Sequence, residues 1–122
     1  MQMKHNTVSI RPFLGAKNFE QSRSFYRHMG FEEVVIAPKL SLFKTGMLAF
    51  YLQDAYVRDW VDNTMVFLEV ENLTTFWDQL QALNLTDTYP DVRLSPIRVE
   101  HWGREGFVHD PSGILWHIGE FF

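Results

Sequence analysis

The sequence contains no cysteine, which excludes disulfide bonds, thiolate metal sites and cysteine nucleophiles. Positive charge is also scarce: 11 lysine and arginine residues stand against 15 aspartate and glutamate residues, and the formal net charge is −4. A chain of this charge without a basic stripe is a poor candidate for nucleic-acid binding. No stretch approaches the roughly 18 apolar residues of a membrane span, and residues 1–10 lack the apolar run of a signal peptide. We therefore expect a cytoplasmic protein that binds neither nucleic acid nor membrane.

Aromatic side chains, by contrast, are abundant. They make up 16% of the 122 residues, within a hydrophobic fraction of 46%, so the chain can bury a substantial core. This length suits one compact domain. Aromatic residues favour strands and are frequent in the walls of small-molecule cavities. The composition therefore predicts a domain rich in strands with a ring-lined cavity.

The same order of elements, a strand, a helix and three strands, is expected twice along the chain. Period-two alternation indicates strands, and apolar residues at helical spacing indicate helices. The first set is expected at 7–16, 18–30, 32–37, 40–44 and 47–53. After a connector at 54–63 with one helical turn, the second set is expected at 64–70, 72–83, 92–103, 104–110 and 114–121.

The two expected helices begin at equivalent residues. Asn18 and Asn72 are the expected N-caps, and Gln21 follows Asn18 at the spacing of a capping box. This repetition indicates an internal duplication. It predicts an α+β fold of two βαβββ modules, at about 7–53 and 64–122. Their sheets are expected to form a curved, half-open mixed β-barrel with the helices outside and a cleft inside.

Alternation also divides each strand into two faces. One face is aliphatic and is expected to pack on the helices: Val8, Ile10, Leu14, Val66, Leu68, Val70, Ile114, Trp116 and Ile118. The other face mixes rings with polar groups, as small-molecule pockets do. Its members are Arg11, Phe13, Ala49, Tyr51, Met65, Phe67, Glu69, Leu115 and His117.

Two inner-face residues carry chemistry. Arg11 is a fixed cation that either pairs with Glu69 or binds an anionic group of a ligand. His117 is favoured as a hydrogen-bonded residue of the inner face, with proton transfer as the alternative. The stretch "EHWGRE" adds His101, Trp102 and Arg104 as candidates for the cleft entrance. The favoured interpretation of this stretch is that Trp102 is a core residue and Arg104 is solvated.

Two motifs resemble the vicinal oxygen chelate superfamily: "FEQSRSFYRHMGF" in the first helix and "WGREGFVHDPSGILWHIGE" near the C-terminus. That superfamily includes glyoxalase I, fosfomycin-resistance enzymes, ring-cleaving dioxygenases and bleomycin-resistance proteins. The resemblance implies paired βαβββ modules and, as in many relatives, a homodimer. The segment "RPFLGAKNF" is most similar to the bleomycin-resistance branch, although Lys17 lies in a stretch where many relatives carry an acidic residue.

The resemblance also locates the metal-ligand positions of the superfamily, which fall near Arg11, at Met65 and at His117. Arginine has no lone pair to donate, and a thioether is too soft for the divalent metals in question. The resemblance therefore implies a metal-independent protein that binds an aromatic or amphipathic small molecule. The alternative is a lyase, isomerase, transferase or dioxygenase that holds zinc, nickel, manganese or iron through the shifted set His101, Glu69 and His117.

Overall fold

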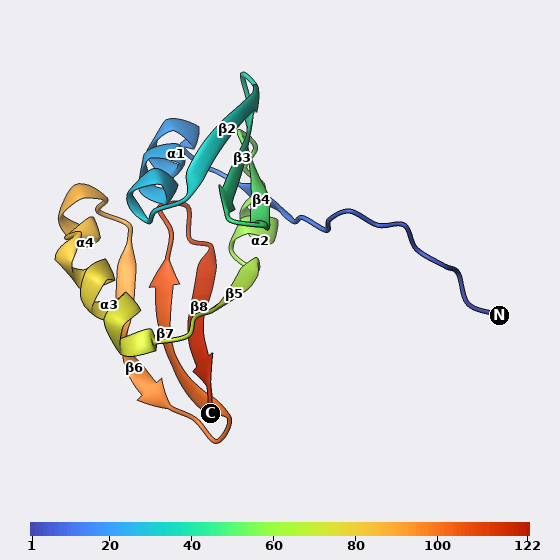
Figure 1. Cartoon of the computed structure of the whole chain (residues 1–122). Coiled ribbons are helices and arrows are strands. Elements are labelled where there is room, and N and C mark those ends of the chain that lie inside the picture. Colours follow the sequence, from blue (N-terminus) through green and yellow to red (C-terminus); the bar gives the residue numbers. More distant parts are fainter.

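The computed structural model describes all 122 residues and contains two four-stranded sheets (Figure 1). Sheet A consists of β1 (Phe13–Gly15), β2 (Glu32–Ala37), β3 (Leu40–Thr45) and β4 (Leu48–Gln53). Sheet B consists of β5 (Met65–Glu69), β6 (Arg93–Val99), β7 (Gly103–His109) and β8 (Leu115–Phe121).

The two sheets have the same topology. Their strand orders are β1-β4-β3-β2 and β5-β8-β7-β6. In each sheet the first strand runs parallel to the fourth, and the remaining pairs are antiparallel. The expected α+β fold of repeated βαβββ units is confirmed, and the sheets stay open rather than closing into a barrel.

Four helices connect the strands: α1 (Phe19–His28), α2 (Arg58–Val61), α3 (Leu73–Ala82) and α4 (Leu85–Thr88). Both expected N-caps are confirmed, because the side chains of Asn18 and Asn72 accept hydrogen bonds from the backbone N–H groups of Gln21 and Thr75. The short helix α4 was not expected from the sequence. None of the helices has the length and apolar character needed to cross a bilayer.

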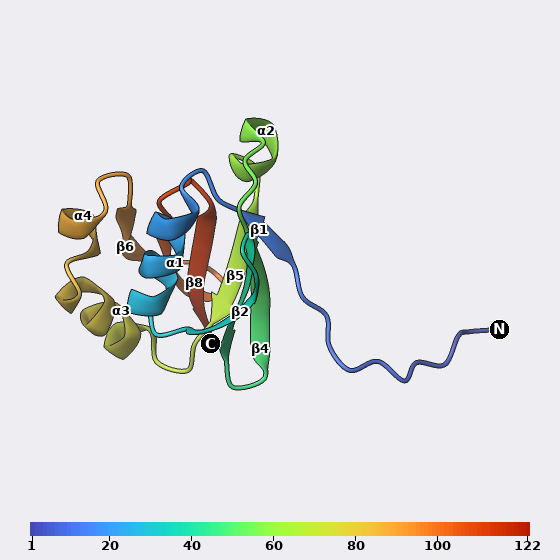
Figure 2. The same ribbon diagram turned by 90° about the horizontal axis from the view of Figure 1, so that it is seen from above.

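The core lies where the helices cover one face of each sheet (Figure 2). Leu14, Ile114, Trp116 and Ile118 are buried there, which confirms the aliphatic face expected for these strands. Helix α1 belongs to the first module but also packs against sheet B. The ring of Tyr26 on α1 lies 5.6 Å, centroid to centroid, from the indole of Trp116 on β8.

The two motifs that carry the family resemblance meet in this core. The hydroxyl of Tyr26 donates to Asp110 at 2.6 Å and accepts from the indole N–H of Trp116 at 3.0 Å. Asp110 also accepts from the backbone N–H groups of Ser112 and Ile114. Burial raises the pKa of Asp110, although its hydrogen bonds act in the opposite direction. These motif residues therefore hold the modules together and do not face a site.

The first strand is much shorter than the expected 7–16. Residues 1–12 contain no strand, and the exposed residues 1–10 form an arm that extends away from the body (Figures 1 and 2). Val8 and Ile10 are 92% and 97% exposed, so their expected place in the core is wrong. Pro12 has no N–H to donate, and the pairing of β1 with β4 begins at Phe13.

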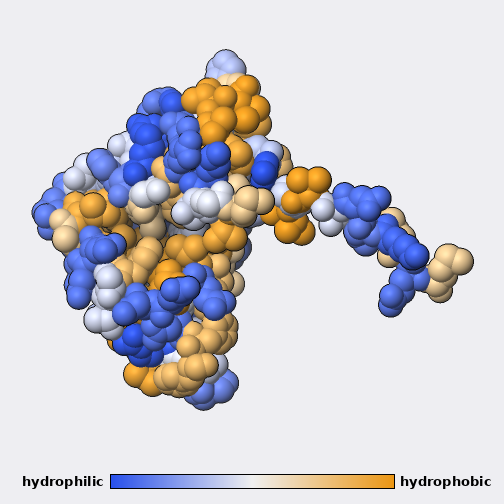
Figure 3. Space-filling view, viewed as in Figure 1, coloured by the Kyte–Doolittle hydropathy of each residue, from blue (hydrophilic) through white to orange (hydrophobic).

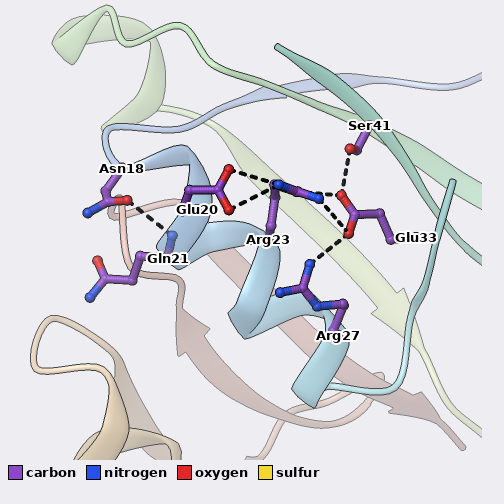
Figure 4. Close-up of polar contacts among 7 residues, drawn as sticks. All are labelled: Asn18, Glu20, Gln21, Arg23, Arg27, Glu33 and Ser41. Carbon is purple, nitrogen blue, oxygen red and sulfur yellow. Dashed lines mark hydrogen bonds and ion pairs between the residues drawn. The ribbon is translucent and has the colours of Figure 1, made fainter. Parts of the chain in front are cut away.

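A charged network joins α1 to sheet A on the surface (Figure 4). Glu33 on β2 accepts hydrogen bonds from Arg23, Arg27 and Ser41, and Arg23 also contacts Glu20. Burial by itself raises the pKa of Glu33, but the hydrogen bonds from Arg23, Ser41 and Arg27 outweigh it and lower the pKa from 4.5 to about 2.

The lowered pKa of Glu33 predicts a specific pH dependence. The folded state favours the ionised form of Glu33 more strongly than the unfolded state does. The ionised carboxylate therefore adds to the free energy of unfolding above pH 4.5, and this contribution is lost as the pH falls toward 2. We expect Glu33→Gln to reduce the free energy of unfolding at neutral pH and to flatten its decrease in acid. Urea unfolding between neutral pH and acid measures both. Glu32→Gln, on the exposed neighbouring residue, is the control, and equal pH curves for Glu33→Gln and the parent would contradict the prediction.

Candidate functional site

The face of sheet B opposite the helices carries most of the expected inner-face residues. Strand β5 pairs with β8 in the register Met65 with Leu115, Phe67 with His117 and Glu69 with Gly119. Met65, Phe67 and Glu69 are exposed, whereas the alternating residues Val66 and Leu68 pack against the core. The alternation therefore placed these side chains on the correct face. Their role in binding remains a prediction.

His117 is held by a carboxylate that the sequence reasoning missed. Its Nδ1 donates to Oε1 of Glu105 at 2.9 Å, and its Nε2 lies 3.5 Å from Sδ of Met65. Glu105 is 8% exposed and reaches His117 from β7. The sequence did contain a signal for Glu105. Residues two apart in a strand point to the same face, so Glu105 and Phe107 lie on one face of β7, and Phe107 is paired with His117. The His117–Glu105 pair fixes the orientation of the imidazole and leaves Nε2 as the nitrogen that can exchange a proton with a ligand.

An aromatic cluster lies beside this pair. The rings of Phe67 and Trp102 are 5.8 Å apart, Phe67 and Phe121 are 5.7 Å apart, and Trp102 and Phe121 are 5.0 Å apart, centroid to centroid. Phe67 is 44% exposed and lies over Gly119, where an added Cβ would come within 2.3 Å of its ring. Trp102 thus contacts two rings of the open face, and its place at a cleft entrance stays a prediction.

Arg11 is placed on sheet A and does not pair with Glu69. Its Nη1 donates to the hydroxyl of Tyr51 at 3.3 Å, and the ring of Tyr51 stacks on Phe13 at 4.7 Å. The Nε of Arg11 is buried without a hydrogen-bond partner. The expected ion pair between Arg11 and Glu69 is therefore not formed, and the Nε–H group of Arg11 is a buried donor without a partner.

The expected convergence of Arg11, Met65 and His117 does not occur within one chain. No hydrogen bond, ion pair or ring contact joins Arg11, Phe13 and Tyr51 to the residues around His117. The physical reason is that β1 and β5 belong to different sheets. One chain therefore presents two separate half-sites.

Arg104 faces the helices and not the cleft entrance. It donates to Glu120 at 3.0 Å and to Thr74 at 3.1 Å, while Glu120 accepts from the backbone N–H of Leu73. The hydrogen bond from Leu73 and then Arg104 lower the pKa of Glu120. Arg104 therefore ties the start of α3 to sheet B, which corrects its expected role. His101 is exposed and makes no side-chain hydrogen bond.

The residues present do not fit a divalent metal. No three histidine, aspartate or glutamate side chains gather anywhere in the chain as a ligand set. The shifted set of His101, Glu69 and His117 is thus not assembled, and Glu105 and His117 supply two donors where stable sites need more.

An apolar groove of about 410 Å³ lies between the arm, β4 and β5. Its walls are Val8, Ser9, Ile10, Pro12, Phe31, Met47, Leu48, Ala49, Phe50, Val66, Phe67, Leu68 and Trp116. Figure 3 shows hydrophobic residues gathered where the arm leaves the body and over the β2–β3 hairpin. The chain therefore leaves apolar surface uncovered next to the residues of both half-sites.

Comparison with known proteins gives the fold. No family model matches the chain, and no curated protein matches it. The bleomycin resistance determinant encoded on the transposon Tn5 superposes with a TM-score of 0.79 at 21% identity, over 94% of this chain and 98% of that one. The bleomycin-binding protein of Streptomyces verticillus, solved with copper(II)-bleomycin, gives 0.80 at 20% identity, over 98% and 100%.

A lactoylglutathione lyase from Agrobacterium tumefaciens also superposes, with a TM-score of 0.71 at 18% identity over 95% of this chain and 96% of that one. At these identities the likeness is one of fold. The chain therefore shares the fold of these bleomycin-resistance and glyoxalase proteins, which is the fold implied by the resemblance of its two motifs.

Proposed function

We propose that this protein binds an aromatic or amphipathic small molecule on the open face of sheet B without a metal. The observation that carries the proposal is the cluster formed by the exposed rings of Phe67 and Phe121 with the half-buried Trp102, beside the His117–Glu105 pair. Rings left open to solvent next to an oriented polar group are the usual make-up of a ligand site. The solved complexes of bleomycin with proteins of this fold support the same class of ligand.

We also propose that the protein is a homodimer in which one copy adds its Arg11 half-site to the His117 half-site of the other. Within one chain no hydrogen bond, ion pair or ring contact joins the two half-sites, and each leaves a ring exposed. The guanidinium of Arg11 forms no ion pair within the chain, which supports a contact with an anionic group of a ligand or of the other copy. The exposed arm and the apolar groove beside it supply surface for the contact between copies.

Ligand binding is tested through the fluorescence of Trp102. The chain has four tryptophans, and Trp60 is 72% exposed, so Trp60→Phe removes the other solvent-facing indole. In this background we expect bleomycin or anilinonaphthalene sulfonate to change the emission in a saturable way. Phe67→Ala should weaken binding about tenfold, because it removes a central ring of the site.

Val35→Ala is the matched control, since Val35 is an exposed apolar residue of β2 outside both half-sites. A dissociation constant unchanged by Phe67→Ala, or weakened equally by Val35→Ala, would refute the site. Stoichiometric zinc, nickel, manganese or iron in elemental analysis would refute the metal-independent part of the proposal.

The dimer is tested by light scattering after gel filtration. We expect a mass of twice 14.4 kDa. Arg11→Ala should weaken ligand binding with the dimer intact, because Arg11 would contribute to the partner's site. A monomer that binds the ligand as tightly as the parent would contradict the shared cleft while leaving the site on sheet B in place.

A further inference from the structure

A second, polar cavity of about 230 Å³ lies beside the turn that connects β7 to β8. It is lined by Lys17, Tyr56, Asp91, Arg93, His109, Pro111, Ser112 and Gly113. None of these residues belongs to the two half-sites. They come from the loop before α1, the connector before α2, the start of β6 and the β7–β8 turn, so the tertiary fold assembles the cavity from distant segments.

The two cations of this cavity have no carboxylate partner. Arg23, Arg27, Arg58, Arg98 and Arg104 each form an ion pair, whereas Lys17 and Arg93 form none. The Nζ of Lys17 lies 5.7 Å from the centre of the Tyr56 ring. Asp91 also lines the cavity but is not within ion-pair distance of either cation.

His109 adds an unpartnered polar atom. Its Nδ1 is buried and makes no hydrogen bond. Burial and then the charge of Arg93 lower the pKa of His109, so Arg93 acts on this ring directly. The two cations without a carboxylate partner are an arrangement that a bound anion would complete, and the ring of His109 in the wall of the same cavity responds to the charge there.

We propose that this cavity binds the oxyanion group of a small molecule, a phosphate being the best match to two unpaired cations. Lysine and arginine bind phosphate through charge-assisted hydrogen bonds, and the Tyr56 hydroxyl adds a neutral donor. Ser112 is less available, because its hydroxyl accepts from the backbone N–H of Lys17 and lies 3.3 Å from the Ser22 hydroxyl. The site is separate from that of His117 and does not depend on the function proposed above.

The test is a titration of the full chain followed by NMR of its five histidine rings, with His109→Gln used to assign His109. Inorganic phosphate should shift the His109 resonances in a saturable way and raise the pKa of His109, because the anion offsets the charge of Arg93. Sodium chloride at the same ionic strength should not. Phenyl phosphate shows whether the site takes the free phosphate ion or the phosphate group of an organic molecule. Tighter binding than that of inorganic phosphate identifies an organic phosphate, and equal binding identifies the free ion.

Two variants locate the site. Lys17→Gln and Arg93→Gln should each weaken phosphate binding about tenfold, since each removes one charge-assisted donor. Both residues are exposed, so the fold should tolerate the changes. Lys39→Gln, which removes an exposed cation outside the cavity, is the control. The absence of a saturable shift at His109, or an equal loss in Lys39→Gln, would overturn the proposal.

Discussion

Tyr26→Phe is expected to lower the free energy of unfolding by about 3 kcal/mol, because it leaves the buried indole N–H of Trp116 without a partner and removes the one side-chain donor to the buried carboxylate of Asp110. The Tyr26 hydroxyl donates to Asp110 and accepts from Trp116, and all three residues are almost fully buried. Urea unfolding at neutral pH measures the loss. The loss of unfolding free energy should be smaller in acid, because a protonated Asp110 is neutral and the hydrogen bond from Tyr26 stabilises it less.

Tyr89→Phe is the matched control for this prediction. Tyr89 is as buried as Tyr26, but its hydroxyl contacts Ser24 and His28 close to the surface. Water can replace that hydroxyl, so we expect a loss of only about 1 kcal/mol. Equal losses in the two variants would show that the Tyr26–Asp110–Trp116 connection does not hold the modules together.

Gly106→Ala is expected to destabilise the protein by about 2 to 3 kcal/mol, because a ring of the core occupies the space that a Cβ needs. An added Cβ on Gly106 would lie 2.5 Å from the indole of Trp77 on α3. Trp77 is buried, and moving it would separate α3 from sheet B. Thermal or urea unfolding measures the change.

Two comparisons isolate this contact. Gly119→Ala puts a Cβ 2.3 Å from Phe67 on the opposite face of sheet B, but that ring is exposed and can turn aside, so a loss under about 1 kcal/mol is expected. In a Trp77→Leu background, Gly106→Ala should cost much less than in the parent, because the ring is gone. If Gly106→Ala lowered the free energy of unfolding as much in the Trp77→Leu background as in the parent, the cause would be the backbone of β7 and not the contact with Trp77.

The local features of this chain were predictable because they depend on neighbours in the sequence. Asn18 and Asn72 cap their helices through bonds to backbone groups three residues away. Alternation placed Met65, Phe67 and His117 on the open face and Trp116 and Ile118 in the core. The arm was the local failure, since alternation at Val8 and Ile10 indicates a strand but cannot say whether another strand pairs with it.

The candidate site was predictable in its residue types but not in its contacts. The sequence identified His117 but not its partner Glu105, which reaches it from the adjacent strand. It offered Glu69 as one partner for Arg11, and the structure gives Tyr51. The cavity for which we propose an oxyanion could not have been found from spacing, since Lys17 and Arg93 are 76 residues apart in the sequence (93 − 17) and line the same cavity only in the folded chain.

The amino-acid sequence by itself determined the order of the strands and of the two long helices, the caps that begin these helices and the buried face of most strands. Those properties follow from periods of 2 and 3.6 residues and from bonds between near neighbours. The tertiary structure alone decided that Tyr26 meets Asp110, that Glu105 holds His117 and that Arg11 and His117 lie on different sheets. A period specifies the direction of a side chain, whereas its partner depends on how segments distant in the chain pack together.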